Sequence, residues 1–336
     1  MRILMVNHEF TITGASVVLL RLATYLRGQG HELTVFPCNP AEGPIKVRYE
    51  ELGIPVLNIA VPTKFDLIIA NTVCSAQVVL QAAPKVKTIW FLHEAEIGLN
   101  ILLKSPELAR AFECASAIVY QTAHQQDAYR SFTYQLDPAK FHIIPNGIDA
   151  PPALPAVPER TRALRVVQVG SVEPRKRPGD LIRAVAASGL DAECIICGKF
   201  FDLDEEARAI VAQAQAQYRL TGEIEPHEAL AWMASADICA LVSESETQGL
   251  SAYEAASLSR PLLLSDIPCH RGVFSHGRNC LMFPPGHVEL LALTLRMYAT
   301  SARLRQEMGA AAHLTAQRFS SAAFFTRFEA LIASLA

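Results

Sequence analysis

The sequence predicts an α/β protein with two Rossmann-like domains, whose parallel sheets face a central cleft. Short apolar runs alternate with helical segments in both halves, which is typical of parallel sheets covered by helices on both faces. A proline-rich stretch divides the chain nearly in half. A length of 336 residues also favours two domains over one.

The composition narrows the class of protein. Hydrophobic residues make up 51% and charged residues 19%, as in a folded domain and not a disordered chain. The net charge of −3, without a long Lys/Arg run, argues against a nucleic-acid partner. We expect no signal peptide, because polar Asn7-His8-Glu9 soon follows Arg2. No apolar stretch approaches the ~18–20 residues that span a bilayer.

The eight cysteines are scattered, several of them inside apolar runs. Buried thiols in a reducing cytosol explain this pattern, so we expect a cytoplasmic protein. Cys194-Ile-Ile-Cys197 has the spacing of a redox motif but lies within a predicted strand. Reactive pairs usually sit at a helix N-terminus, so we expect no redox chemistry here.

The first half opens as a βαβ unit. Arg2–Asn7 reads as a buried strand, His8–Ala15 as a loop, Ser16–Arg27 as a helix and Glu32–Phe36 as a strand. Gly14 in the strand-to-helix turn is weak evidence for phosphate binding, and an ordinary turn glycine is the alternative. Further strands are predicted at Asp66–Ala70, Lys87–Leu92, Ala117–Gln121 and Phe141–Ile144.

Ligands of such sheets bind beyond the carboxyl ends of the strands. This rule selects Asn7-His8-Glu9 after the first strand and His93-Glu94 after the apolar run that ends at Leu92. Either histidine could instead be a packed or solvated loop residue. His93 is the stronger candidate, because it follows four apolar residues and opens an acidic loop.

The composition changes between Ile144 and Arg165. Pro145-Asn-Gly-Ile-Asp149 has turn chemistry, and four prolines crowd the positions that follow it. We therefore predict an N-terminal domain over 1–150, a stiff linker over 151–162 and a C-terminal domain over 163–315. A helix within 316–336 is expected to pack back towards the N-terminal domain through its phenylalanine-rich face.

The second half repeats the pattern. Strand Ala163–Val169 leads into a loop that carries Arg175, Lys176 and Arg177. Cations at the carboxyl end of a first strand could neutralise a diphosphate, and a solvated basic turn is the alternative. The other predicted elements are strands at 192–197, 238–242 and 261–265, and helices at 180–187, 204–217, 288–297, 301–314 and 322–335.

One stretch, Leu241–Asp266, carries most of the functional signal. Glu246 is expected in a loop, and Glu254 in the opening turn of the next helix. Gly249 and Leu250 between them would offer backbone N–H groups at the helix N-terminus, where an anion is stabilised. Hydroxyl acceptors on both sides of a phosphate cradle suit a nucleotide sugar. Alternatively, Ser251-Ala-Tyr-Glu254 is a capping box with the serine as N-cap.

These segments together resemble the retaining glycosyltransferases of family 4, which have the GT-B fold. The resemblance covers nearly the whole chain. Its most specific part is the Glu-x7-Glu segment from Glu246 to Glu254. Pro145-Asn-Gly-Ile-Asp149, Ser265-Asp-Ile-Pro268 and the segment Gly277–Gly286 follow the family's order as well.

The resemblance implies roles at the diphosphate. Lys176, with Arg175 beside it, would stabilise the diphosphate leaving group. Gly14 would let the first loop approach that diphosphate closely. The backbone amides around Gly249 and Leu250 would hold sugar and phosphate.

The remaining implied roles concern hydroxyl groups. Glu254 would accept hydrogen bonds from the ribose, and Glu246 from the transferred sugar. His93 would line the transferred sugar and the acceptor side. Domain closure would bring Gly14 and His93 to face the cations of the second half.

The implied reaction transfers a sugar from a nucleoside-diphosphate sugar to a glycan, lipid-linked or small-molecule acceptor. We expect no cofactor and no metal, because side-chain cations would oppose the charge on the leaving diphosphate. Peripheral contact with the inner face of the membrane is left open. The nucleotide base, the sugar and the acceptor are not determined at this point.

Three positions depart from the family pattern. Ser171 stands where many relatives have arginine, Arg177 where glycine is usual, and Ser251 where proline is usual. Ser171 keeps a non-catalytic sugar-nucleotide-binding protein as an alternative. A nucleotide-sugar epimerase or a phosphorylase of the same fold is a further alternative.

Overall fold

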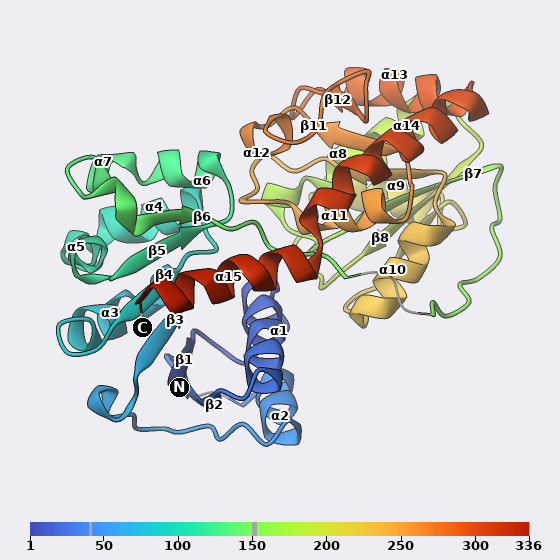
Figure 1. Ribbon diagram of the computed structural model, residues 1–336. Helices are drawn as coiled ribbons and strands as arrows, with labels where there is room; N and C mark the ends of the chain where they lie inside the picture. Colours follow the sequence, from blue (N-terminus) through green and yellow to red (C-terminus); the bar gives the residue numbers. More distant parts are fainter. Residues whose placement is uncertain (40–41, 150–152, 336) are drawn as a thin grey trace. The chain divides into compact units, whose positions relative to one another are not determined.

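The computed structural model describes residues 1–39, 42–149 and 153–335. The chain divides into two compact units, coloured along the sequence in Figure 1. Unit 1 comprises Met1–Asn146 and the C-terminal residues from Phe324 onward, and unit 2 comprises Gly147–Ala323. Pro151 and Pro152, at the start of the predicted linker, lie outside the described residues.

In the described part of unit 1, six parallel strands form one sheet in the order β2-β1-β3-β4-β5-β6. The strands are β1 (Arg2–Asn7), β2 (Glu32–Pro37), β3 (Leu67–Asn71), β4 (Thr88–Phe91), β5 (Ala117–Tyr120) and β6 (Phe141–Ile143). The helices are α1 (Gly14–Gly28), α2 (Pro44–Glu51), α3 (Ala76–Ala82), α4 (Glu96–Lys104), α5 (Ala111–Cys114), α6 (Ala123–Ala128) and α7 (Arg130–Thr133). Short 3₁₀ turns are η1 (Pro62–Lys64), η2 (Val73–Ser75), η3 (Pro106–Arg110) and η4 (Pro138–Lys140).

Unit 2 repeats this plan, with six parallel strands among its described residues in the order β12-β11-β10-β7-β8-β9. The strands are β7 (Leu164–Val169), β8 (Ala192–Cys197), β9 (Tyr218–Leu220), β10 (Ile238–Leu241), β11 (Leu262–Ser265) and β12 (Leu281–Phe283). The helices and turns are η5 (Pro174–Lys176), α8 (Pro178–Ser188), α9 (Glu205–Gln213), α10 (Pro226–Ser235), α11 (Leu250–Ser257), α12 (Pro268–Arg271), α13 (Val288–Ala299), α14 (Ala302–Ala316) and η6 (Gln317–Phe319). Helix α15 (Ser321–Leu335) begins in unit 2 and continues in unit 1.

The apolar strands are explained by burial on both faces of each sheet. In unit 2, Val166 of β7 and Ile196 of β8 pack into a core with α8 and α13. Val167 and Ile195, which alternate with them, pack into a second core with α10 and α11. Because successive side chains of a strand point to opposite faces, both faces require apolar residues, and the sequence shows continuous apolar runs.

The same alternation separates Cys194 from Cys197. Cys194 lies in the first core and Cys197 in the second, on opposite faces of β8. Both are free, and burial raises the pKa of each thiol to about 12. Their spacing therefore brings no reactive pair together.

The aromatic face of α15 packs within unit 1. Phe324 and Phe328 lie against Phe91 of β4, with ring centroids 6.2 and 5.2 Å from its ring. Phe325 stacks on Tyr25 of α1 at 4.3 Å. Aromatic contacts of this kind account for the phenylalanine-rich pattern of the segment.

The predicted fold class is confirmed, whereas several boundaries are wrong by one or two residues. Helix α1 begins at Gly14 and not at Ser16, because Thr13 acts as its N-cap and accepts a hydrogen bond from the Ser16 N–H. Asp204 is likewise an N-cap, so α9 begins one residue after the predicted start and ends earlier. Strand β9 and helix α10 had no counterpart in the predicted elements. Within the described ranges, no helix is both long and apolar enough to cross a bilayer.

Candidate functional site

The carboxyl edge of the unit 2 sheet carries a cluster of paired charges. Lys176 ends η5, the turn that follows β7, and its side chain extends over Gly170. Its Nζ forms an ion pair with Oε1 of Glu246, which lies in the loop after β10. Arg175 Nη1 lies 3.4 Å from Oε2 of the same carboxylate. The side chain of Glu246 is only 8% exposed, so this pairing is shielded from solvent.

Further polar contacts hold the cluster in place. Ser243 Oγ donates to Glu246 Oε1 at 2.7 Å. Arg175 donates to the Ser245 carbonyl and to Glu173 Oε1, both at 2.8 Å. Burial by itself would raise the pKa of Glu246, but the positive charges of Lys176 and Arg175 oppose this effect. The resulting pKa of Glu246 is below its ordinary value of 4.5. Glu246 is therefore an ionised acceptor at neutral pH.

Helix α11 begins directly after this loop, and its start differs from the predicted capping box. Gly249 is the N-cap, with a left-handed φ of +72°, and Leu250 is the first helical residue. Ser251 is consequently inside the helix, and Glu254 lies in its second turn instead of its first. The capping-box alternative is wrong, because the glycine starts the helix two residues before the serine. The Ala252 N–H donates to the Gly249 carbonyl oxygen at 2.9 Å, so an anion at the start of α11 would be held by the N–H groups that precede Ala252.

A histidine that the sequence analysis missed lies behind this turn. His270 is fully buried, and its Nδ1 is 2.8 Å from the Ser265 carbonyl oxygen. A carbonyl can only accept, so Nδ1 carries the proton and Nε2 is an acceptor. Nε2 has no hydrogen-bond partner among the described residues, and a Cβ added at Gly249 would lie 3.1 Å from it. Burial lowers the pKa of His270. Its position two residues after the family-like segment Ser265–Pro268 was the available signal.

The backbone conformation at Arg177 explains why glycine is usual at this position in the family. Its backbone is left-handed, with a φ of +48°, a conformation that glycine adopts without strain. A side chain there costs about 1–2 kcal/mol. Arg177 Nε donates to Asp180 Oδ2 at 2.6 Å, which offsets part of that cost. The family's usual glycine therefore matches the backbone at this position.

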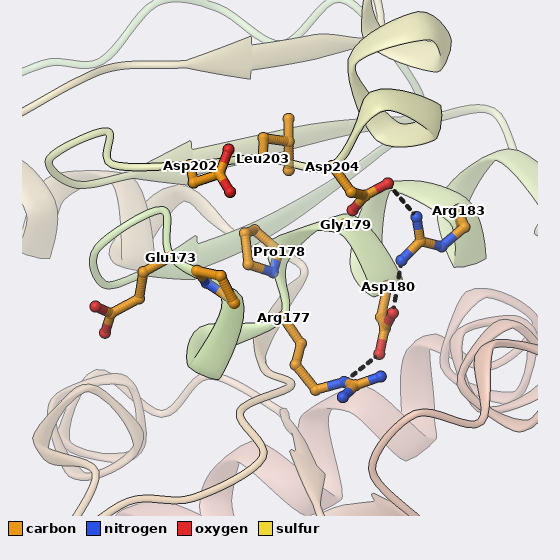
Figure 2. A pocket seen from close by; sticks show the side chains of 10 residues that line it. Glu173, Arg177, Pro178, Gly179, Asp180, Arg183, Asp202, Leu203 and Asp204 are labelled. Carbon is orange, nitrogen blue, oxygen red and sulfur yellow. Dashed lines mark hydrogen bonds and ion pairs between the residues drawn. The ribbon is translucent and has the colours of Figure 1, made fainter. Parts of the chain in front are cut away.

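Figure 2 shows the hollow beside this turn, about 200 Å³ in volume. Four of its charged side chains pair with one another, since Arg183 bridges Asp180 at 2.8 Å and Asp204 at 2.6 Å, and Arg177 also contacts Asp180. The residues that line the hollow do not include Lys176 or Glu246. Its paired charges explain the local structure of the loop, and we assign it no ligand.

The candidate glycine of unit 1 has open space around it. Gly14 is the first residue of α1, and a Cβ added there would meet no atom of the described residues within 4 Å. Packing within the described chain therefore does not require a glycine. The alternative, an ordinary turn glycine, therefore gives no steric reason for a glycine at position 14. Close approach of a ligand to Gly14 stays a prediction.

The candidate histidine of unit 1, His93, lies just after β4. Its ring packs on Phe91 at a centroid distance of 4.2 Å, and its Nδ1 is 2.6 Å from Gln121 Nε2. Burial, together with the nearby His8, lowers the pKa of His93 to about 3. Glu94 Oε2 accepts the backbone N–H groups of Val73 and His93, so part of the acidic loop supports the backbone.

His8 lies in the loop after β1, where its Nε2 is 3.4 Å from Glu9 Oε1. Burial lowers the pKa of His8. This arrangement fits the packed-loop alternative. Nothing in it assigns a ligand to His8.

The structure thus brings Arg175, Lys176 and Glu246 into contact, with Gly249 and Leu250 a few residues further along the same loop. Gly14 and His93 belong to unit 1. Across residues 1–39, 42–149 and 153–335, no group of three or more His, Cys, Asp or Glu side chains is arranged to hold a metal ion. Gln121, Ser243 and His270 complete the local networks and were not predicted.

Two protein-family models match the chain. The family "Glycosyltransferase Family 4" matches residues 12–150, and "Glycosyl transferases group 1" matches residues 154–315. Curated relatives include three D-inositol 3-phosphate glycosyltransferases. That of Jonesia denitrificans is 25% identical over 62% of this chain, and that of Kribbella flavida is 29% identical over 62%. In both cases the match spans about half of the relative, 54%.

Solved structures resemble the chain over nearly its full length. HepE from Anabaena, in complex with UDP-glucose, has a TM-score of 0.83 and 19% identity, and the match covers 100% of both chains. Sucrose-phosphate synthase from Thermosynechococcus elongatus has a TM-score of 0.78 and 17% identity, covering 99% of this chain and 98% of that one. The lipopolysaccharide outer core galactosyltransferase WaaB has a TM-score of 0.73 and 16% identity, covering 99% of each chain. These likenesses confirm the fold.

The two matched models and the two parallel sheets agree with the resemblance drawn from the sequence motifs. The chain belongs to glycosyltransferase family 4 and has the GT-B fold.

Proposed function

We propose that this protein is a retaining glycosyltransferase, which moves a sugar from a nucleoside-diphosphate sugar to an acceptor hydroxyl. The contact of Lys176 and Arg175 with the buried Glu246, next to the N-terminus of α11, supports this most strongly. It combines cations for a diphosphate with an ionised acceptor for sugar hydroxyls.

The chemistry follows from where charge develops. Cleavage of the glycosyl–phosphate bond leaves negative charge on the diphosphate and positive charge on the anomeric carbon. Lys176 and Arg175 would stabilise the first, and such fixed donors contribute about 3–4 kcal/mol each to lowering a barrier. Glu246, held ionised by the same cations, would accept hydrogen bonds from the transferred sugar.

The other predicted residues complete the donor site in this proposal. Glu254 would accept from the ribose hydroxyls, and the N–H groups at Gly249 and Leu250 would hold sugar and phosphate. Gly14, with no neighbour at its Cβ position, would leave room for the diphosphate. His93 would line the transferred sugar.

No protein nucleophile is assigned. In the proposed step the acceptor hydroxyl bonds to the anomeric carbon as the bond to the diphosphate breaks. The hydroxyl proton passes to a phosphate oxygen of the departing nucleotide. The proposal includes metal independence, because the charges that oppose the leaving group are side-chain cations.

We propose a UDP-sugar as donor, and UDP-glucose as the first to test. The support is HepE, which was solved with UDP-glucose and matches the whole length of this chain. The acceptor is a hydroxyl in bacterial glycan, glycolipid or glycoconjugate synthesis. The names of the inositol phosphate and lipopolysaccharide relatives are compatible with that range.

The test begins with binding and ends with a product. Thermal unfolding is measured with UDP, GDP and ADP and with their glucose and galactose conjugates, because a ligand of the folded state raises the melting temperature. UDP and one UDP-sugar should raise it most, with or without EDTA. That donor is then incubated with acceptor panels, and UDP release and the anomeric configuration of the product are measured. An inverted product, or no response to any nucleotide, would contradict the proposal.

A further inference from the structure

The side-chain amide of Gln121 determines which nitrogen of His93 carries the proton. Gln121 Nε2 donates to the Leu92 carbonyl oxygen at 3.2 Å and lies 2.6 Å from His93 Nδ1. A carbonyl oxygen only accepts, so the amide must turn its nitrogen, not its oxygen, towards Leu92. The second hydrogen of that nitrogen is then directed at Nδ1. Nδ1 therefore accepts, and a neutral His93 has its proton on Nε2.

Gln121 is itself held by a buried network. It is 2% exposed, and its backbone N–H donates to Gln125 Oε1 at 2.6 Å. Gln125 Nε2 in turn donates to the Glu94 carbonyl at 2.9 Å. Each amide in this chain of hydrogen bonds has one compatible orientation, because each faces a group that only donates or only accepts.

The other ring nitrogen of His93 is left without a partner. Nε2 is buried and makes no hydrogen bond within the described residues. A buried donor without an acceptor costs roughly 1–3 kcal/mol. A ligand oxygen at Nε2 would recover that cost.

We propose that Gln121 is a positioning residue that keeps His93 neutral with its proton on Nε2, so that His93 presents a fixed hydrogen-bond donor to an oxygen of the bound sugar substrate. The inference rests on the proposed function, because it takes His93 to line the transferred sugar. It adds the direction of the hydrogen bond and the residue that sets it.

Burial is the main reason that the pKa of His93 is low, and the nearby His8 adds to the effect, since its positive form opposes a second charge on His93. Glu9, in the same loop after β1, pairs with His8, whose Nε2 is 3.4 Å from Glu9 Oε1. Glu94 lies in the same loop, but its carboxylate is occupied by backbone N–H groups and burial raises its pKa. The Cys74 thiol of η2 lies near Glu94 and stays protonated, since burial raises its pKa. His93 should thus remain a neutral donor between about pH 5 and 8, where an ordinary histidine titrates.

The first experiment uses ¹⁵N NMR on the whole protein labelled at histidine, with the His93 signals assigned by their loss in His93→Gln. We expect Nε2 to be protonated and Nδ1 to be the bare acceptor, unchanged from pH 7 to pH 5. A proton on Nδ1, or titration in that range, would overturn the inference. This measurement needs no substrate, so it decides the inference about Gln121 even if the proposed transferase activity is not found.

The second experiment changes the group that faces Nδ1. In Gln121→Glu a carboxylate, which only accepts, should draw the proton to Nδ1 and remove the donor at Nε2. We expect the tautomer to switch and turnover to fall about tenfold to a hundredfold, as for the loss of one hydrogen bond, with little change in donor KM. Gln135→Glu adds the same charge at an exposed position, and it should change neither the tautomer of His93 nor the turnover. A switched tautomer with unchanged turnover would contradict the role at the substrate.

Two further variants remain informative if Gln121→Glu folds poorly. The amide nitrogen of glutamine reaches about the position of Nε2 of histidine, and that of asparagine about the position of Nδ1. His93→Gln should therefore keep part of the turnover and His93→Asn should lose it. The reverse order would contradict a donor at Nε2.

Discussion

The two units have matching sheets, but different pairs of side chains lie at the carboxyl edges of their strands. In unit 2 the edge holds Lys176 and Arg175 against the ionised Glu246. In unit 1 it holds the neutral His93 against the uncharged amide of Gln121. We propose a division of labour, in which unit 2 compensates the charge of a diphosphate and unit 1 supplies directed hydrogen bonds.

The buried histidines of the two units carry their protons on different ring nitrogens. His93 faces an amide donor, so its Nε2 is a donor. His270 faces a backbone carbonyl, so its Nε2 is an acceptor. Burial lowers the pKa of both rings, yet the group at Nδ1 gives them opposite hydrogen-bonding roles.

The largest effect should come from removing charge at the unit 2 edge. Lys176→Met removes the cation nearest Glu246, and turnover should fall by about 10²–10³-fold while the affinity for intact UDP-glucose changes much less. Steady-state kinetics and calorimetric titration measure the two quantities. Lys85→Met, an exposed lysine of unit 1, is the matched control and should behave like the parent. Equal turnover in both variants would break the proposed division of labour.

Glu254→Gln should act mainly on binding. If Glu254 accepts from the ribose, the amide loses a charge-assisted hydrogen bond, and UDP affinity should fall about tenfold. UDP affinity is measured by titration for Glu254→Gln and for a control variant, Glu289→Gln. Glu289 is an exposed carboxylate in the first turn of α13, so the control makes the same chemical change away from the site. Unchanged affinity would remove Glu254 from the site, although Lys176 would still be tested by the first experiment.

Gly14, the first residue of α1, and Gly249, the N-cap of α11, should respond differently to alanine. At Gly249 the left-handed φ, and the 3.1 Å approach of an added Cβ to His270 Nε2, should make Gly249→Ala about 1–3 kcal/mol less stable. At Gly14 the space is open, so Gly14→Ala should stay within about 0.5 kcal/mol of the parent. Denaturant unfolding measures both. UDP-sugar affinity that survives Gly14→Ala would contradict a diphosphate in close contact with this glycine.

Acidification should act through His93 before it acts through Glu246. The folded-state pKa of His93, about 3, is below its ordinary value of 6.5, so its stabilising contribution is complete above pH 6.5. It is lost as pH falls towards 3, because the unfolded chain then binds the proton that the folded chain excludes. Glu246, whose pKa is also lowered, loses its contribution only as pH falls below 4.5.

His93→Gln should therefore lose less stability than the parent between pH 7 and pH 5, by about 1–2 kcal/mol. Glu246→Gln should track the parent in that range and differ from it only at lower pH. Melting temperatures across pH 4–7 provide the measurement. Parallel curves for the parent and His93→Gln would show that His93 titrates normally.

The sequence was informative about periodicity and less so about exact starts. Short apolar runs between helical segments predicted β1, β7 and β8 to within a residue. Each of these strands is buried on both faces of its sheet, so its apolar residues follow one another without interruption. The start of α11 was wrong, because Ser251–Glu254 fits a capping box locally while Gly249 sets the start through its left-handed backbone. Strand β9 was missed, because its three residues are too few to show a period.

By itself, the sequence determined the fold class, the family and the residue types available at each sheet edge. Local apolar periods and ordered motifs carry that information along the chain. Only the tertiary structure decided that Glu246 is ionised between two cations, and that His93 and His270 carry opposite tautomers. Those properties depend on Gln121, Ser265 and Lys176, and on burial, which bring together groups far apart in sequence; no local pattern encodes such contacts.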